Sequence, residues 1–465
     1  MNINNVLVKA SLESLAAKRL ATELMPVPPP LNILIVKLSS LGDVVHTLQA
    51  VMDIHAEFVD AKIDWVVERS FAPLLKICPA VNRVIESDIR AWRKSWWKQK
   101  TRKEFIDFKK QLQENTYDAI IDLQGLTKSA IVSKLAKLKF GGHRYAMGNQ
   151  TNGASYEFMT RWVADKAIDV HAQVHAVERA RIICSKALGY SYPRPEQLRT
   201  EIYHGELTPL VVSPSLMVPP QTVALVHASS REDKTWPLQN WTELGEELIK
   251  LGFNIALPQG SPKELEMARQ ISNTLPGSKV WVKMSLNETA AHLCACVGVI
   301  GVDSGLSHIA EALDLPLVQI YNFDTYWRTG PQRLPFQKSV YANPTPSVQD
   351  VLTNWKECWN TFAAHKKDSK FNHLSLINDD EAVPLPDHIK AEIKEHIQDT
   401  TVLVVSDLNK TPIESLTQLN SISLPSDIEK KKSISSVRKT KASKTEPSPS
   451  PSPSPGPNPQ PDLFD

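Results

Sequence analysis

The sequence predicts an α/β protein built from two similar domains, followed by a long tail that does not join their cores. Short apolar runs of strand length alternate with helix-like segments, which is typical of parallel sheets covered by helices on both faces. These runs fall into two groups, before and after the polar, proline-bearing stretch 191–220. With 465 residues, 42% of them hydrophobic, the chain is long enough for two such cores.

The apolar runs define the expected strands and domain boundaries. The expected strands are Ile33–Val36, Ile63–Val67 and Ala119–Leu123 in the first group, and Val223–Val226, Ile255–Leu257, Val280–Val282, Val297–Val302 and Leu317–Tyr321 in the second. We therefore expect an N-terminal extension at 1–30, an N-terminal domain at 31–200, a linker at 201–220, a C-terminal domain at 221–365 and a tail at 366–465.

The two ends of the chain differ in composition from the domains. The start has the spacing of a short amphipathic helix and precedes a proline hinge at Pro26–Pro30. The tail carries the basic stretch KKKSISSVRKTKASK and a Ser-Pro repeat, and it has too little apolar area to offset its ordering entropy. We expect a solvated, largely disordered tail, with a membrane-surface or partner tether as the alternative and Val402–Val405 as a short apolar exception.

Overall composition narrows the class of protein. The net charge of +2 gives no general affinity for nucleic acid, so any attraction to anions must come from local clusters. The five cysteines lack metal-ligand spacing, and such a sparse, odd number predicts reduced thiols in a cytosolic enzyme. No apolar run approaches the roughly 18 to 20 residues that span a bilayer, and the first residues lack a signal-peptide core.

The stretch ILIVKLSSLGDVVH joins a predicted strand to a predicted helix through a tight turn. Gly42 has no Cβ, so it lets another molecule approach the backbone, and Asp43 lies in the first helical turn at the carboxyl end of the strand. One interpretation makes the Ser and Asp residues ordinary helix caps. The other makes Asp43 a general base for a hydroxyl group, because its charge would repel a phosphate.

Two turns of the second domain suit an anion. The loop after Val223–His227 carries Ser229, Ser230 and Lys234, whose hydroxyls and ammonium can bind phosphate. The turn after Val297–Val302 reads DSGLSH, and it leaves helix N–H groups open to an anion. The alternative for this turn is an aspartate cap with a core histidine. Taken together, the two turns predict a phosphate site.

A local basic cluster, RAWRKSWWKQKTRK, covers residues 90–103. We expect Arg90, Arg93 and Lys94 to bind acceptor anions, and the interleaved tryptophans suit a membrane interface. The alternative is a solvated helix whose tryptophans enter the core. Nucleic acid would also attract such a stretch, but no stacking-domain motif accompanies it, so we expect no nucleic-acid partner.

The chain resembles the ADP-heptose:lipopolysaccharide heptosyltransferase family, and most closely its heptosyltransferase I branch. The resemblance rests on motifs in the family's order over about residues 31–365: ILIVKLSSLGDVVHTL, IRAWRKSWW, YDAIIDLQGLTKSA, QVHAVERAR, HASSREDKTWP, KMSL and GVDSGLSHIAEALDLP. It implies a GT-B fold, two Rossmann-like domains facing a cleft. It also implies inverting transfer of L-glycero-D-manno-heptose from ADP-heptose to a Kdo residue of Kdo2-lipid A, peripherally on the cytoplasmic face of a Gram-negative inner membrane.

The resemblance also assigns roles to individual residues. Asp43 matches the catalytic aspartate. The donor would contact a second set: Ser229, Ser230, Lys234, Glu264, Met284, Asp303, Ser304, Gly305 and His308. The acceptor would lie near Ser40, Gly42, Arg90, Arg93, Lys94 and Gln124. The resemblance makes Glu264 the acid that binds the ribose. The alternative is that Glu264 is an ordinary acidic residue in the first turn of a helix.

Several features limit or extend this assignment. No Asp-x-Asp motif lies near the turns, so we expect no cofactor and no catalytic metal. His171 and His175 have helical i, i+4 spacing that could bind a metal, but without a third ligand a structural or acceptor-side role for His175 is favoured. Ala91 and the loop GNQTNGASYEF depart from the family on the acceptor side. Rival functions are another heptosyltransferase, such as heptosyltransferase II, and a non-catalytic nucleotide-sugar-binding scaffold.

Overall fold

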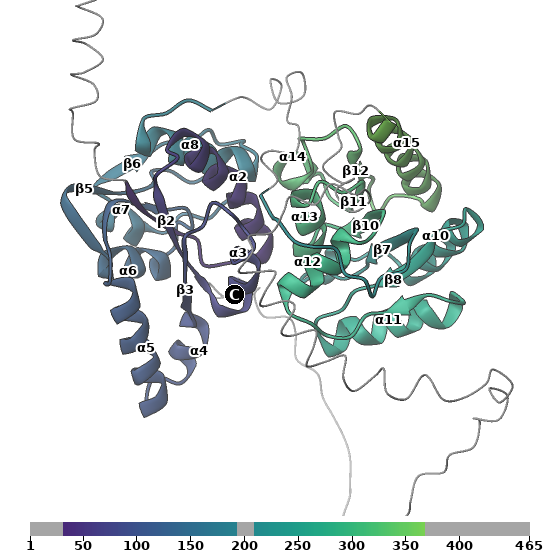
Figure 1. Cartoon of the computed structure of the whole chain (residues 1–465), viewed down its shortest axis with the longest axis horizontal. Coiled ribbons are helices and arrows are strands. Elements are labelled where there is room, and N and C mark those ends of the chain that lie inside the picture. Colours follow the sequence, from purple (N-terminus) through teal and green to yellow (C-terminus); the bar gives the residue numbers. More distant parts are fainter. Residues whose placement is uncertain (1–30, 193–208, 368–465) are drawn as a thin grey trace, which may run out of the picture. The chain divides into compact units, whose positions relative to one another are not determined.

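The computed structural model describes residues 31–192 and 209–367 (Figure 1). The predictions for the N-terminal extension, for the first part of the linker and for the tail after residue 367 concern segments outside these described residues. No described helix is long and apolar enough to cross a membrane. All five cysteines lie within the described part of the chain, and each is a free thiol.

The first half of the chain forms a six-stranded parallel sheet in the order β3-β2-β1-β4-β5-β6. Its strands are β1 Asn32–Val36, β2 Lys62–Glu68, β3 Arg83–Ser87, β4 Thr116–Asp122, β5 Lys137–Met147 and β6 Lys166–Ile168. The helices are α2 Leu41–Glu57, η1 Arg69–Phe71, α3 Ala72–Leu75, α4 Ile89–Lys94, α5 Gln99–Leu112, α6 Thr127–Leu135, α7 Phe158–Val163 and α8 Ala176–Leu188.

The second half repeats this plan, with strand order β12-β11-β10-β7-β8-β9, again all parallel. Its strands are β7 Thr222–Val226, β8 Asn254–Leu257, β9 Lys279–Val280, β10 Gly298–Val302, β11 Leu317–Tyr321 and β12 Gln337–Tyr341. The helices are η2 Glu232–Lys234, α10 Leu238–Lys250, α11 Pro262–Thr274, α12 Leu286–Cys294, α13 Gly305–Ala312, α14 Tyr326–Thr329 and α15 Val348–Lys367.

The prediction of two Rossmann-like α/β domains is confirmed, because each sheet has the doubly wound strand order. In such sheets the chain reverses its direction of travel beside the first strand, and ligands bind at the carboxyl ends of the strands flanking that point. β1 and β4 flank it in the first sheet, and β7 and β10 flank it in the second. The SSLGD turn follows β1, and the two predicted phosphate turns follow β7 and β10.

Four strands were missing from the predicted set, namely β3, β5, β6 and β12. Their sequences, RVIES, KLKFGGHRYAM, KAI and QKSVY, contain no long apolar run. They lie toward the outside of the sheets, where one edge or face is not covered and polar side chains are tolerated. The missed strands do not carry the predicted site residues.

The two halves meet where α2 packs against α13. A Cβ added to Gly305 would lie only 2.5 Å from Cδ2 of Leu41, so the first turns of these helices approach closely because residue 305 is a glycine. Likewise, a Cβ on Gly42 would lie 2.9 Å from Cδ2 of His308. Both helices begin directly after a central strand, and their N-terminal ends therefore come together from the two sheets.

Candidate active site

Asp43 lies in the first turn of α2 and helps to cap the N-terminus of this helix. Ser40 is the N-cap residue, and Asp43 Oδ2 accepts hydrogen bonds from the Ser40 backbone N–H at 3.2 Å and the Ser40 Oγ at 2.9 Å. The capping interpretation of this turn is therefore correct. It does not exclude a chemical role, because the capping contacts use only one carboxylate oxygen.

The other oxygen, Asp43 Oδ1, faces two buried cations. Lys37 Nζ lies 3.6 Å away and Arg179 Nη2 lies 3.8 Å away. Burial raises the pKa of Asp43, but the charges of Lys37 and Arg179, together with the Ser40 hydrogen bonds, outweigh it and lower the pKa to about 2. The side chain is still 36% exposed, so this ionised carboxylate remains open to a second molecule.

Side chains from three other elements hold the turn before α2. Gln124 Oε1 accepts hydrogen bonds from the backbone N–H groups of Leu38 and Ser39, at 3.1 and 3.0 Å. Ser39 Oγ in turn lies 2.9 Å from Lys128 Nζ and 3.4 Å from Arg90 Nη2. Gln124 thus positions the turn through its carbonyl oxygen, and two cations lie beside that turn.

On the second sheet, Lys234 and Asp303 form a close ion pair. Lys234 Nζ lies 2.6 Å from Asp303 Oδ2, and Ser229 Oγ donates to the Asp303 carbonyl at 3.2 Å. These contacts join the loop after β7 to the turn after β10. Burial raises the pKa of Asp303, but His308 and Lys234 more than reverse this and hold it well below its usual range.

His308 is a buried cation beside this pair. Its Nε2 lies 3.2 Å from Asp303 Oδ1, and its Nδ1 lies 3.5 Å from Glu311 Oε2. Burial lowers the pKa of His308, but the two carboxylates outweigh burial and raise the pKa to about 9. The alternative interpretation, a core histidine, is correct in that His308 is buried. Its raised pKa nevertheless keeps the imidazole positively charged within the site.

Ser304 is the N-cap of α13, and its side chain makes no capping hydrogen bond to the helix. Its Oγ lies 3.4 Å from Ser307 Oγ instead. The first N–H groups of a helix lack intrahelical partners and carry the positive end of its dipole. The end of β10 therefore has open helix N–H groups beside two cations, Lys234 and His308, whose charges Asp303 and Glu311 already pair.

Glu264 and Met284 lie farther along the second sheet. Glu264 stands in the first turn of α11, and its Oε2 accepts a hydrogen bond from the Gly260 N–H at 2.7 Å. This contact fits the alternative interpretation of Glu264, an ordinary acidic residue in the first turn of a helix. Met284 is half-buried and packs against the hydrophobic core.

A single cleft of about 710 Å³ brings most of the predicted residues together. Its lining includes Ser40, Gly42, Asp43, Arg90, Ser229, Ser230, Lys234, Glu264, Met284, Asp303, Ser304, Gly305 and His308. Arg93, Lys94 and Gln124 are not part of this lining. The first two are exposed near the end of α4, and Gln124 lies in the turn after β4.

The sequence-based assignment missed several side chains at or beside the cleft, and some of them are charged or can ionise. They include Lys37, His46, Lys128, Arg179 and Arg328. Lys37 offered a signal, because an ionisable residue directly after a buried strand faces the ligand-binding edge of the sheet. Arg179 belongs to the motif QVHAVERAR, which was identified in the sequence. However, Arg179 follows Asp43 by 136 positions, and no local sequence pattern predicts that the two side chains meet.

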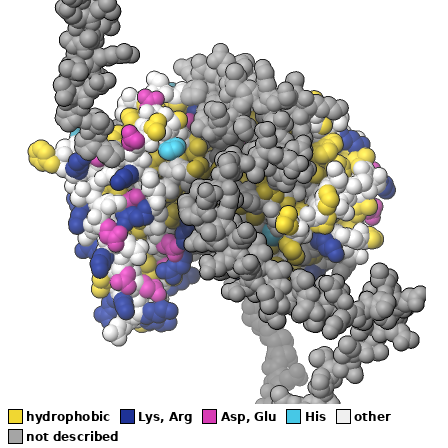
Figure 2. Space-filling view, viewed as in Figure 1, with side chains coloured by type: hydrophobic (Ala, Val, Ile, Leu, Met, Phe, Trp, Pro, Cys, Tyr) yellow, Lys and Arg dark blue, Asp and Glu magenta, His cyan; other side chains and the backbone are white. Residues whose placement is uncertain are grey.

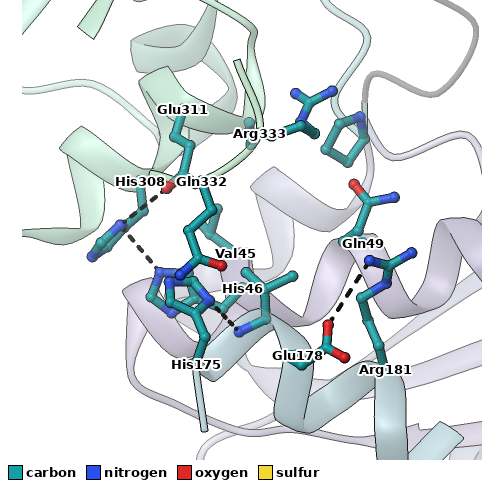
Figure 3. Close-up of a pocket in the computed structure, with 13 residues that line it drawn as sticks. Val45, His46, Gln49, His175, Glu178, Arg181, His308, Glu311, Gln332 and Arg333 are labelled. Carbon is teal, nitrogen blue, oxygen red and sulfur yellow. Dashed lines mark hydrogen bonds and ion pairs between the residues drawn. The ribbon is translucent and has the colours of Figure 1, made fainter. Parts of the chain in front are cut away.

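A small cavity of about 70 Å³ lies beside this cleft, between α2, α8 and α13 (Figure 3). Within the described residues, His46, His308 and Glu311 are near enough to share a metal ion, with their ligand atoms all within 4.8 Å of one another. A metal would compete with the proton that Asp303 and Glu311 stabilise on His308. Figure 3 shows His46 and His175 side by side in this cavity.

The helical spacing expected for His171 and His175 is wrong, because α8 begins only at Ala176. His171 is exposed in the preceding loop. His175 is buried and caps α8: its Nδ1 accepts from the Val177 N–H at 3.2 Å, and its Nε2 lies 2.9 Å from the Gly330 carbonyl oxygen. Burial lowers the pKa of His175 to about 4, so it is neutral and structural.

Known proteins resemble this chain in sequence and in fold. Residues 105–350 match the sequence model of Glycosyltransferase family 9 (heptosyltransferase). Lipopolysaccharide heptosyltransferase 1 of Escherichia coli (strain K12) is 38% identical over 292 residues, which are 63% of this chain and 88% of that protein. The structure of E. coli heptosyltransferase WaaC with ADP superimposes with a TM-score of 0.57 and 32% identity over 72% of this chain and 99% of that one. For WaaC with ADP-2-deoxy-2-fluoro heptose, the TM-score is 0.54 at 32% identity, over 73% and 99%.

Proposed function

Because the chain belongs to glycosyltransferase family 9, the heptosyltransferase family, and is a glycosyltransferase of GT-B fold, we propose that it adds heptose to the lipopolysaccharide inner core. The donor would be ADP-heptose and the acceptor a Kdo residue of Kdo2-lipid A. One observation carries the proposal: a single cleft has an ionised carboxylate, Asp43, on one sheet, and Lys234 with the N-terminus of α13 on the other. A scaffold protein would have no need for this combination.

The donor would bind along the second sheet. The diphosphate would lie beside Lys234 and the open N–H groups at Ser304 and Gly305, because helix N-termini favour anions. Lys234 would then exchange part of its contact with Asp303 for the phosphate oxygens. Ser229 and Ser230 offer hydroxyl groups nearby, while Glu264 and Met284 lie where a ribose and a nucleobase would extend. Related WaaC structures hold ADP and an ADP-heptose analogue.

The transfer step requires one proton acceptor. The attacking Kdo hydroxyl oxygen forms a bond to the anomeric carbon as the bond to the ADP oxygen breaks, and ADP leaves with the electron pair. Attack from the face opposite ADP inverts the anomeric centre, and the hydroxyl proton passes to Asp43. General-base help of this kind is typically worth roughly 10²- to 10⁴-fold.

The low pKa of Asp43 favours a late proton transfer. Lys37 and Arg179 keep the carboxylate ionised but also make it a weak base. A weak base accepts a proton only after the hydroxyl has become acidic, which happens as its oxygen bonds to the anomeric carbon. On the donor side, Lys234 and the N-terminus of α13 would stabilise the negative charge that grows on ADP.

The acceptor is a membrane glycolipid, so the first sheet's domain, residues 31–200, would face the cytoplasmic side of a Gram-negative inner membrane. The basic cluster on α4 and α5 supports this. Arg93 and Lys94 are exposed, and so are Trp96 and Trp97, at 48% and 72%. Figure 2 shows dark blue Lys and Arg side chains over this part of the molecule. Trp92 instead fills the core next to Phe105 and Phe108, as the alternative interpretation expected for the tryptophans. Binding of the acceptor or membrane by the exposed residues remains part of the proposal. The second domain, residues 221–365, would bind the donor.

ADP release measured with purified protein tests the proposed function. With ADP-heptose and Kdo2-lipid A together, ADP should form in step with a heptosylated lipid. Without acceptor, release should be slower by orders of magnitude. Equal release with and without acceptor, or transfer only to a lipid that already carries heptose, would argue against this function.

A further inference from the structure

Two arginines lining the cleft have buried nitrogen atoms without a hydrogen-bond partner. Arg179, on α8, is 6% exposed, and its Nη1 contacts no acceptor among the described residues. Arg328, on α14, is half-buried, and its Nε is equally unpartnered within that part of the chain. Buried donors are nearly always paired in folded proteins, because an unsatisfied buried donor loses its hydrogen bonds to water without replacement.

The loop residue Gly153 brings these arginines together. A Cβ added to Gly153 would lie 2.5 Å from Arg328 Cδ and 3.7 Å from Arg179 Nη1. A methyl group here would collide with the Arg328 side chain, so the glycine lets Arg328 lie at this point with Arg179 Nη1 close by. Arg179 comes from the first sheet's domain and Arg328 from the second, so the guanidinium groups approach the same part of the cleft from two sides.

The charges at this point do not balance. The charges that act on Arg179 are one carboxylate, Asp43, and a second cation, Arg328, and Asp43 also pairs with Lys37. Burial lowers the pKa of Arg179, Asp43 raises it, and the nearby charge of Arg328 lowers it again. Like charges held close together in a partly dry cleft favour a bound anion between them.

We propose that Arg179 and Arg328 bind the carboxylate of the acceptor sugar acid, an assignment that rests on the proposed function in which Kdo is the acceptor. Guanidinium groups pair with carboxylates through two parallel hydrogen bonds. The position of Arg179 favours binding of the acceptor over binding of the donor. Its Nη2 lies 3.8 Å from Asp43 Oδ1, the oxygen that would receive the acceptor's proton. The donor diphosphate has its own cations at Lys234 and His308.

This site would give the enzyme its selectivity for an acidic acceptor sugar. A carboxylate held by both arginines fixes the ring on which the attacking hydroxyl stands, so that hydroxyl is directed at Asp43. A neutral sugar would leave the guanidinium nitrogens unpaired. Because the arginines come from both domains, the acceptor would also help to hold the two sides of the cleft together.

The test compares two acceptors in wild-type protein and in Arg328→Gln: Kdo2-lipid A, and the same lipid with its Kdo carboxylates reduced to alcohols. Charge-assisted hydrogen bonds contribute about 1.5–3 kcal/mol, so wild type should show a roughly 10- to 100-fold higher KM for the reduced acceptor. Arg328→Gln should raise the KM for the native acceptor by a similar factor and leave that for the reduced acceptor unchanged. The KM for ADP-heptose should stay the same.

Arg269→Gln is the matched control, since Arg269 is exposed on α11 and does not line the cleft. The wild-type comparison needs no variant, so a folding defect in Arg328→Gln cannot hide the result. If wild type uses both acceptors equally well, or if the substitution weakens ADP-heptose binding instead, the carboxylate site is wrong while the proposed function stands. If wild type transfers heptose to neither lipid, the proposed function fails, and this assignment fails with it.

Discussion

His46 Nε2 lies 3.2 Å from His308 Nδ1, although 262 residues separate them in the chain. This contact joins α2 of the first domain to α13 of the second, and the imidazole rings meet edge to face at 4.2 Å between centroids. His308 also contacts Asp303, which binds Lys234. A continuous set of polar contacts therefore runs from the helix that carries Asp43 to the lysine that would bind phosphate.

Replacing Asp43 by Asn should lower kcat by roughly 10²- to 10⁴-fold, because the amide cannot accept the acceptor's proton. The Kd for ADP should change by no more than a few-fold, since Asp43 lies on the other sheet from Lys234. The Asn carbonyl oxygen can still accept a hydrogen bond from the Ser40 N–H, so α2 should remain folded. Steady-state kinetics and calorimetric titration with ADP measure the two quantities. Wild-type kcat in this variant would rule out Asp43 as the base.

Replacing Lys234 by Met should raise the Kd for ADP by roughly 10- to 100-fold through loss of a charge-assisted contact to phosphate. Lys263→Met is a suitable control, because Lys263 pairs with Glu232 on the surface of the same region and both side chains are largely exposed. Surface ion pairs contribute little. An equal loss of ADP affinity in both variants would mean that general positive charge, and not Lys234, binds the diphosphate.

Activity should fall at alkaline pH as His308 loses its proton. Its pKa in the folded protein is about 9, above the ordinary value of 6.5. The stabilisation from the imidazolium is therefore complete below pH 6.5 and is lost as the pH rises through about 9. We expect kcat/KM and the melting temperature to decline together over this range. In His308→Gln, which cannot titrate, this part of both pH profiles should be flat, and an unchanged profile would assign the decline to another group.

Reversing the charges of Arg93 and Lys94 to Glu should raise the KM for Kdo2-lipid A in anionic vesicles and leave the KM for ADP-heptose unchanged. Both residues are exposed on α4, beyond the cleft lining, so any effect must come from the membrane or from distant acceptor groups. Lys110→Glu, in the last turn of α5, provides the control. The difference should shrink in high salt, because screening weakens exposed charges. An unchanged KM would show that this cluster does not contact the acceptor or its membrane.

Gly305→Ala should destabilise the contact between α2 and α13. The added methyl would lie 2.5 Å from Leu41 Cδ2 and 2.8 Å from Leu41 Cβ, and overpacking of this kind typically costs about 1–3 kcal/mol. Thermal unfolding should show a lower melting temperature, and the double variant Leu41→Ala/Gly305→Ala should recover part of it by making room. Failure of the second substitution to restore any stability would locate the defect elsewhere, for example in the start of α13.

Much of the fold was predictable because its central strands are buried on both faces. Runs such as ILIV and VGVIGV must be apolar wherever they lie in a parallel sheet, so their sequences identify them directly. The outer strands β3, β5, β6 and β12 were not predicted from the sequence, because their partial exposure permits charged residues within them. Similarly, SSLGD and DSGLSH were recognisable since a helix start depends on residues within one turn of each other.

The sequence by itself determined which turns carry chemistry, since each strand, its turn and the following helix are local in the chain. Only the tertiary structure decided what surrounds them. Lys37 is local to Asp43, and Asp303 and Glu311 are local to His308, but Arg179 reaches Asp43 from α8 and His46 reaches His308 from α2. The partners that come from other helices and from the opposite sheet are separated in sequence by more than a hundred residues. Electrostatic interactions depend on distance in space and on burial, and neither quantity is encoded in the spacing of residues along the chain.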